Sequence, residues 1–267
     1  MDVFGKDALI GDYRLSDHGL TLCTFNYEDN YDLGVTHNTE EAFLGRNPVP
    51  VYLGSKYSSK LMPTFTVMQK ECVTGRRNFT VNEIREILGR LTGYQGYKKF
   101  YLYKDEVLEN MYYNVHVIDA SFEKAGEDIV AITFSAECDS QFAWVDESIT
   151  YENGSIEETI RLQVNSDDKY NYLLPTVVIT PDCGINSFSI INVTDNNREV
   201  VIDNVSSGEV ITMDSKHNII TSTIPRNFSE DFNYKFIRLL SGENELQISG
   251  PCSITFNMSL PRKVGVL

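Results

Sequence analysis

The alternation of apolar and polar side chains near the C-terminal end places the strongest constraint on the fold. Residues 253–260 alternate Ser, Thr or Asn with Ile, Phe, Met or Leu, a period of two that is typical of a half-buried β-strand. Leu246 and Ile248 repeat the pattern, and Ser249-Gly250-Pro251 between the two runs is a turn signal. We therefore predict a hairpin over residues 246–260. An isolated hairpin is only marginally stable in water, so this one must complete a larger sheet.

Short strand-like runs separated by turn signals occupy the rest of the second half. They cover residues 176–180, 187–193, 199–202, 209–213, 218–221 and 234–240. No stretch of helical length and period interrupts them. This spacing favours a β-sandwich or barrel, which the predicted terminal hairpin would close.

One helix is predicted in the first half, over residues 80–92. Thr80 and Glu83 have the spacing of a capping box, and Phe79 and Ile84 that of a hydrophobic staple. Gly93 is placed to end the helix as a left-handed cap. One face of this helix is an apolar stripe that is predicted to pack on the core, formed by Val81, Ile84, Ile87, Leu88 and Leu91. Arg85, Glu86 and Arg90 lie outside the stripe.

The remaining strands of the first half are predicted at residues 20–25, 64–70, 100–103, 113–117 and 130–136. Residues 26–46 show no sustained period, and prolines and glycines continue this irregular stretch to Gly54. A loop of this length is usually functional or unpaired until a partner binds. The strand pattern stops at Phe142-Ala143-Trp144, before the acidic segment 145–158. We place the domain boundary there, giving domains 1–144 and 145–267.

Charge and cysteine content narrow the range of functions. The formal net charge of −15 is spread over both halves of the 267 residues. Because affinity for nucleic acids or anionic membranes comes from cationic contacts, this charge makes the chain a poor candidate for binding either one. The five cysteines are widely spaced and form no Cys-x-x-Cys motif, which indicates buried thiols from a reducing compartment. No signal peptide and no membrane span is recognised. We expect synthesis in a cytoplasm and no membrane insertion.

No motif for catalysis, metal binding or cofactor binding is recognised. The four isolated histidines lack metal-ligand spacing, and nucleophile elbows, P-loops and dinucleotide fingerprints are missing. A glycosidase carboxylate pair depends on a distance that the sequence does not provide. Because the chain has 38 acidic residues, any apparent carboxylate pair is best interpreted as part of a solvent-exposed face. Trp144, the only tryptophan, is interpreted with Phe142 as a domain-boundary anchor, and sugar stacking is the alternative. We expect a protein that is not an enzyme and has no cofactor.

The order and spacing of several motifs resemble the distal tail proteins of long-tailed siphophages over nearly the whole chain. In the second half these are Gly208-Glu209-Val210-Ile211-Thr212-Met213-Asp214 and the run of residues 236–250, which ends Gly242-Glu243-Asn244-Glu245-Leu246-Gln247-Ile248-Ser249-Gly250, with Pro261-Arg262 after it. In the first half they are the helix with Thr80, the run Phe100-Tyr101-Leu102-Tyr103, the pair Tyr112-Tyr113 and Phe142-Ala143.

The resemblance implies a structural protein of the virion, located at the tail tip. Its first half would be a tail-tube-like β domain with one helix that forms a homo-hexameric ring, and its second half a galectin-like β-sandwich. The ring would join the tail tube protein to the tail-associated tip protein, contact receptor-binding or baseplate proteins and let DNA pass without specific binding. The second half lacks the His, Asn, Arg and Trp cluster of sugar-binding galectins. A carbohydrate-binding adhesion module is the alternative function.

Two segments are candidate subunit or tube contacts. The first is the irregular segment 26–46, and the second is the exposed face of the helix. Ordinary solvent-exposed surface is the competing interpretation for both. The candidate residues are Tyr27, Asp32, His37, Arg46, Arg85, Glu86 and Arg90.

Overall fold

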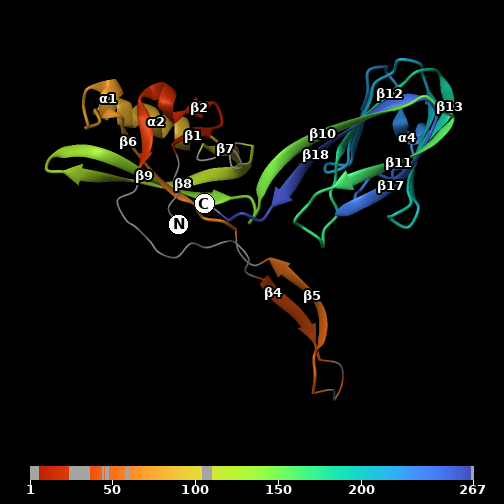
Figure 1. Ribbon diagram of the computed structural model, residues 1–267, viewed down its shortest axis with the longest axis horizontal. Coiled ribbons are helices and arrows are strands. Elements are labelled where there is room, and N and C mark those ends of the chain that lie inside the picture. Colours follow the sequence, from red (N-terminus) through yellow and green to blue (C-terminus); the bar gives the residue numbers. More distant parts are fainter. Residues whose placement is uncertain are drawn as a thin grey trace. The chain divides into compact units, whose positions relative to one another are not determined.

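The computed structural model describes residues 6–23, 37–43, 45, 48–57, 60–103 and 110–265. The chain divides into two compact units, which are described separately (Figure 1). The first comprises Met1–Trp144 with Lys263–Leu267, and the second comprises Val145–Arg262. Strands account for most of the described structure, so the predicted mainly β fold is confirmed.

An antiparallel sheet forms the body of the first unit. Its strand order is β3-β6-β9-β8-β7-β1-β2, and the long strand β8 pairs with β7 through its first residues and with β9 through the rest. The strands are β1 (Asp7–Ile10), β2 (Tyr13–Arg14), β3 (Leu20–Cys23), β6 (Thr64–Gln69), β7 (Lys98–Tyr103), β8 (Tyr112–Ala125) and β9 (Asp128–Cys138).

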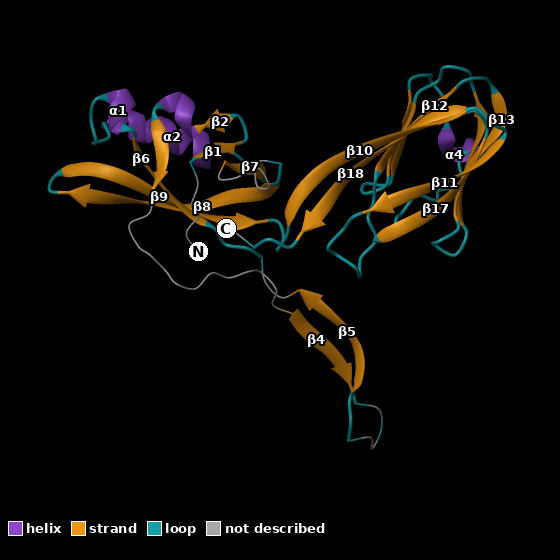
Figure 2. Ribbon diagram, in the orientation of Figure 1, coloured by secondary structure: helices purple, strands orange, loops and turns teal. Residues whose placement is uncertain are grey.

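Helix α2 (Val81–Thr92) covers one face of this sheet together with the short α1 (Glu71–Thr74) (Figure 2). Ile87 and Leu91 of α2 are buried in the core of the unit. Beneath them Phe65 stacks between two other rings, with centroids 5.5 Å from Phe100 and 5.3 Å from Phe134. The helix therefore has one packed face and one free face, as its sequence predicts.

Two details of α2 differ from the prediction. Val81 is 80% exposed, because it lies in the first turn, beyond the part of the stripe that reaches the core. Gly93 has φ −79° and is not a left-handed cap. Its N–H donates to the Gly89 carbonyl at 3.2 Å, and an added Cβ would collide with that oxygen. Glycine is needed here for this close approach rather than for a positive φ.

The short helices α1, η1 (Leu15–His18) and α4 (Phe228–Asp231) were not predicted. Each has four residues, too few to display a helical period. The expectation of a single helix is therefore correct only for helices long enough to carry a sequence pattern.

A separate two-stranded sheet is formed by β4 (His37–Ala42) and β5 (Val51–Tyr57). The prediction of irregular structure through residue 54 is therefore wrong for both strands. β4 carries an almost entirely polar sequence, and β5 exposes side chains on both faces, so neither strand shows a one-sided apolar pattern. Residues 24–36 of the predicted loop lie outside the described part of the chain.

The second unit is a β-sandwich. One sheet has the order β16-β15-β12-β18-β10 and the other β11-β17-β13-β14, and a single apolar core fills the space between them. The strands are β10 (Ala143–Asn153), β11 (Glu157–Val164), β12 (Thr176–Pro181), β13 (Ile185–Asn192), β14 (Arg198–Val205), β15 (Ile211–Asp214), β16 (Ile219–Ser222), β17 (Gly242–Ser249) and β18 (Cys252–Arg262).

The predicted terminal hairpin is wrong, although both of its strands exist. β17 pairs with β11 and β13, whereas β18 pairs with β12 in the opposite sheet. The turn at Gly250 has φ +90°, and an added Cβ would approach Ile185 Cδ1 to 2.7 Å. Glycine thus lets the chain cross between the layers, so that Leu246 and Phe256 enter one core from opposite sides.

Two other predictions for the second half need correction. Residues 234–240 form only an isolated bridge between Leu239 and Leu173, although Ile237 and Leu239 are fully buried. The acidic segment 145–158 contains most of strand β10 and the start of β11. Asp146 and Glu152 lie on the exposed face of β10, where Asp146 accepts a hydrogen bond from Ser259 Oγ at 2.8 Å.

The last residues return to the first unit, in contrast to the predicted domain 145–267. Tyr113 Oη donates to the carbonyl of Gly265 at 2.6 Å. Lys263 Nζ lies 4.9 Å from the ring centroid of Tyr57 and 5.9 Å from that of Phe142. These contacts hold residues 263–265 against the first unit. The sequence of these residues has no periodicity from which the contacts could be predicted.

Candidate functional site

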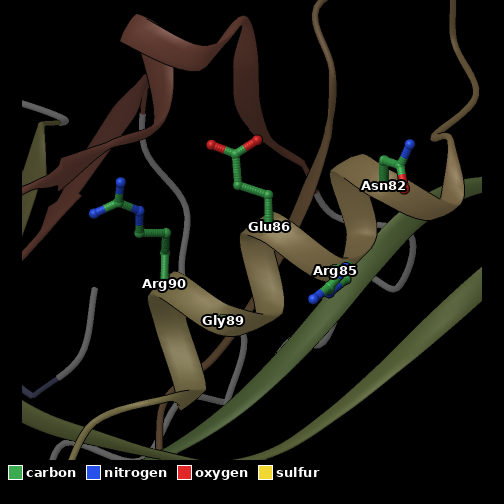
Figure 3. Close-up of a pocket in the computed structure, with 5 residues that line it drawn as sticks. All are labelled: Asn82, Arg85, Glu86, Gly89 and Arg90. Atoms are coloured by element: carbon green, nitrogen blue, oxygen red, sulfur yellow. The ribbon is translucent and has the colours of Figure 1, made fainter.

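The free face of helix α2 carries three of the predicted contact residues. Arg85, Glu86 and Arg90 are exposed and line, with Asn82 and Gly89, a shallow hollow of about 490 Å³. Figure 3 shows Glu86 and Arg90 projecting from one side of the helix, as their four-residue spacing requires. None of the three charged side chains forms an ion pair with another described residue. The predicted exposure is observed, and the contact role stays a prediction.

The capping box fixes where this helix begins. Glu83 Oε2 accepts a hydrogen bond from Thr80 N at 2.8 Å, and Thr80 Oγ1 accepts one from Glu83 N at 3.4 Å. Arg76 forms an ion pair with the same carboxylate. Burial works to raise the pKa of Glu83, but the Thr80 hydrogen bonds and the Arg76 guanidinium hold it below its ordinary value. The start of α2, and thus the position of its free face, is well fixed.

The β4–β5 hairpin exposes large apolar side chains. Phe43 is 70% exposed, Val49 65%, Tyr52 57% and Leu53 65%. The register shifts between Glu40 and Glu41, which is a β-bulge of the kind found near functional edges. Within the described ranges, neither strand pairs with any strand but the other. This apolar surface is the feature of the site that sequence patterns miss.

The predicted contact residues of segment 26–46 are only partly visible. Tyr27, Asp32 and Arg46 lie outside the described residues. His37 is the first residue of β4, where its backbone pairs with Tyr57, and its side chain is not described. Their role in contacts between subunits stays a prediction.

The aromatic residues predicted as a boundary anchor are both held in place. Phe142 is 6% exposed and meets Tyr57 edge-on, with ring centroids 5.2 Å apart. Trp144 Nε1 donates to Asp139 Oδ1 at 3.2 Å, and its backbone pairs with Tyr112. Trp144 is the last residue of the first unit before Val145, and the described contacts of both side chains are structural.

The described ranges contain neither a cluster of metal-binding side chains nor a helix suited to crossing a membrane. Over residues 6–23, 37–43, 45, 48–57, 60–103 and 110–265, no three His, Cys, Asp or Glu side chains gather as a metal site would need. Over the same ranges no helix is long and apolar enough to cross a membrane.

One solved structure with the same fold is a phage hub protein. The SPP1 Dit (gp 19.1) protein, described as a paradigm of the hub adsorption apparatus in phages infecting Gram-positive hosts, superposes with a TM-score of 0.67 at 10% identity. The match covers 95% of this chain and 98% of that one. A chain of the phage P2 baseplate in its activated conformation with calcium gives a TM-score of 0.49 at 10% identity, covering 92% of each chain.

Two protein-family models match the sequence. A comparison with curated proteins finds no significant match. Residues 4–140 match the family described as phage tail protein N-terminal domain, and residues 142–258 match the family described as phage tail C-terminal domain. The two matches account for nearly the whole sequence. The chain therefore belongs to this family of phage tail proteins.

Proposed function

We propose that this protein is a structural hub of the phage tail that assembles into a homo-hexameric ring. In this role the ring joins the tail tube protein to the tail-associated tip protein and to receptor-binding or baseplate proteins. The second unit, with a galectin-like arrangement, faces the host-recognition apparatus. The single observation that carries the proposal is the apolar hairpin β4–β5, which the described part of the chain leaves uncovered.

The energetics of the hairpin support a second copy of the chain as its partner. A two-stranded hairpin by itself is marginally stable in water, and burying a large apolar side chain contributes about 1.5–3 kcal/mol. Tyr52 and Leu53 are both more than half exposed in the single chain. Covering them against a neighbouring copy stabilises the hairpin and the assembly together. When each copy covers its neighbour head to tail and the rotation between neighbours closes after six copies, the contacts form a hexameric ring.

The charge balance supports the passage of DNA through such a ring. Affinity for the phosphate backbone comes from lysine and arginine contacts, and the chain carries a formal net charge of −15. An acidic ring repels the phosphates and releases DNA without specific binding. The protein works through interfaces and not through catalysis, and it is located at the tail tip of the virion.

Light scattering and negative-stain imaging of the full-length protein test the proposal. The expected result is a hexamer that appears as rings, together with recovery of the protein from purified virions. The variant Tyr52→Asp with Leu53→Asp should remain monomeric and should be absent from virions, because each carboxylate would be buried without a partner.

Ile156→Asp is the matched control, since Ile156 is 82% exposed and lies in the second unit. This control should assemble as the unmodified chain does. Hexamers formed equally well by the hairpin variant, or a chain that stays monomeric and never enters virions, would contradict the proposed function.

A further inference from the structure

The second unit contains a pocket lined by aromatic rings and neutral polar groups. It has a volume of about 410 Å³, within the usual range for small-ligand sites. Its walls come from the turn before β16, from α4 and from the segment that follows α4. The lining residues are Asn218, Ile220, Asn227, Phe228, Ser229, Phe232, Tyr234 and Phe236.

Aromatic rings provide the floor and the rim. Phe232 is 5% exposed and Phe236 9%, and their rings meet edge-on with centroids 5.2 Å apart. Tyr234 is 65% exposed, with its ring centroid 5.8 Å from that of Phe232. A buried aromatic pair therefore supports an exposed tyrosine ring, which can pack against the face of a ligand.

The backbone holds Tyr234 in a strained conformation. Its φ is +56°, which is rare for a bulky residue and costs about 1–3 kcal/mol. Its neighbours are fixed: Asn233 N donates to the Val201 carbonyl at 3.2 Å and Asn233 Nδ2 to the Glu199 carbonyl at 3.0 Å. Strain of this kind persists only where surrounding contacts impose it, and it is concentrated at functional sites.

The polar groups of the pocket are neutral and available. The Asn218 amide, the Ser229 hydroxyl and the Tyr234 hydroxyl make no hydrogen bond within the described ranges. Asn227 Oδ1 accepts from Ser229 N at 3.1 Å, which leaves the Asn227 Nδ2 group as a donor. Together these side chains provide both donors and acceptors.

No lining residue carries a charge. Arg226, whose Cζ atom lies 4.7 Å from the Phe228 ring centroid, has its guanidinium committed to Glu209 and Asp231. The lining residues therefore offer no charged partner to a phosphate or carboxylate, and the net negative charge of the chain would oppose binding of such a group.

We infer that this pocket binds a neutral sugar, a hexose or N-acetylhexosamine unit of a glycan. A pyranose ring has a C–H face that packs on the tyrosine ring and hydroxyl groups that match the amide and hydroxyl side chains. Both kinds of contact are present in the pocket, and the charged partners that an acidic sugar needs are missing from its lining. This binding function goes beyond the hub role, because it gives each copy its own contact with a polysaccharide.

Titration of the full-length protein against neutral glycans tests the inference. The probes are oligosaccharides of glucose, galactose, N-acetylglucosamine and N-acetylgalactosamine, first arrayed and then followed by saturation-transfer NMR at concentrations on the order of 1 mM. At least one of these glycans should bind, and Tyr234→Gly should raise its Kd about tenfold or more. Glycine relieves the positive φ, so loss of binding would not come from unfolding.

Asn218→Ala should weaken binding as well, and Tyr170→Ala is the matched control. Tyr170 is 74% exposed in the same unit and does not line the pocket, so its substitution should leave the Kd unchanged. Failure of every neutral glycan to bind would overturn the inference. So would binding of acidic glycans only, equal binding by Tyr234→Gly, or an assembled tail in which another protein fills the pocket.

Discussion

Removal of one guanidinium should destabilise the whole second unit. Glu209 is 1% exposed, and Arg226 Nη1 lies 3.1 Å from its Oε1 and 3.3 Å from its Oε2. Ser222 Oγ and Ser206 N donate to the same carboxylate, at 2.6 Å and 3.0 Å. Arg226 also pairs with Asp231 at 2.8 Å. The network ties α4 to the turn before β15.

The expected cost follows from the burial of Glu209. Arg226→Met keeps much of the packing volume but leaves a buried carboxylate without its cation, which costs about 3–5 kcal/mol. For a domain of the size of Val145–Arg262, each kcal/mol lowers the Tm by about 3–5 °C. We therefore expect the unfolding transition of the second unit to shift downward by roughly 10–20 °C.

Differential scanning calorimetry of the full chain is the suitable assay, because the only tryptophan, Trp144, belongs to the first unit and would not report this transition. Adding Glu209→Leu to Arg226→Met removes the unpaired charge and should recover at least about half of the loss. Arg161→Met is the control: this residue is exposed and its nitrogen lies 3.9 Å from Glu243, so the change should cost less than about 1 kcal/mol.

The same network predicts the response to acid. Burial works to raise the pKa of Glu209, but hydrogen bonds from Ser206 and Ser222 and the Arg226 guanidinium lower it below its ordinary value of 4.5. A lowered folded-state pKa gives stability that is complete above about pH 4.5 and is lost as the pH falls further. The dependence of stability on pH below about 4.5 should therefore be weaker in Arg226→Met than in the unmodified chain. The reasoning would be refuted if Arg226→Met lowered the free energy of unfolding by less than about 1 kcal/mol. It would also be refuted if the double variant Arg226→Met with Glu209→Leu were as unstable as Arg226→Met alone.

Three further outcomes can be checked directly. Thr80→Ala removes the cap of α2 and should lower the stability of the first unit by about 1 kcal/mol in urea unfolding; an unchanged midpoint would count against the cap. Arg85→Glu should reduce incorporation into tails, measured by mass spectrometry of virions, without changing the Tm, since Arg85 is exposed and unpaired among the described residues. Cys72 and Cys183 are exposed and should react quickly with a thiol reagent at pH 8, whereas burial raises the pKa of Cys138 to about 12 and should keep it unreactive.

The parts of the fold that the sequence predicts well have local, one-sided signals. Helix α2 carries a cap and an apolar stripe within its own twelve residues, and it forms as expected from Thr80 onward. Strands β12 to β18 of the sandwich are found close to their predicted positions, whereas β10 and β11 begin in a segment for which no strand is predicted. Pairing is different, because Gly250 joins two alternating strands in the same way whether they lie in one sheet or in two. Only the shared core of β17 and β18 decides that they face each other across the layers.

The candidate site shows where such patterns fail. Arg85, Glu86 and Arg90 could be placed on a free surface because the opposite side of their helix is apolar. The pocket of the second unit could not be predicted, because Phe232 and Phe236 lie in a segment held by isolated bridges and side-chain hydrogen bonds rather than by a continuous strand. Arg198 Nε, for example, donates to the Phe236 carbonyl at 2.9 Å. A periodic sequence pattern cannot predict a contact between residues so far apart in the sequence.

The hairpin β4–β5 escapes prediction for a reason that bears on its role. A strand shows a period of two when one face meets a core of its own chain and the other meets water. Val51, Tyr52 and Leu53 are consecutive and all exposed, so they occupy both faces and erase that period. These three residues gain little from burial within the single chain, and their sequence is explained if both faces meet partners after assembly. The proposed contacts between copies of the chain would account for both the missing period and the exposed apolar surface.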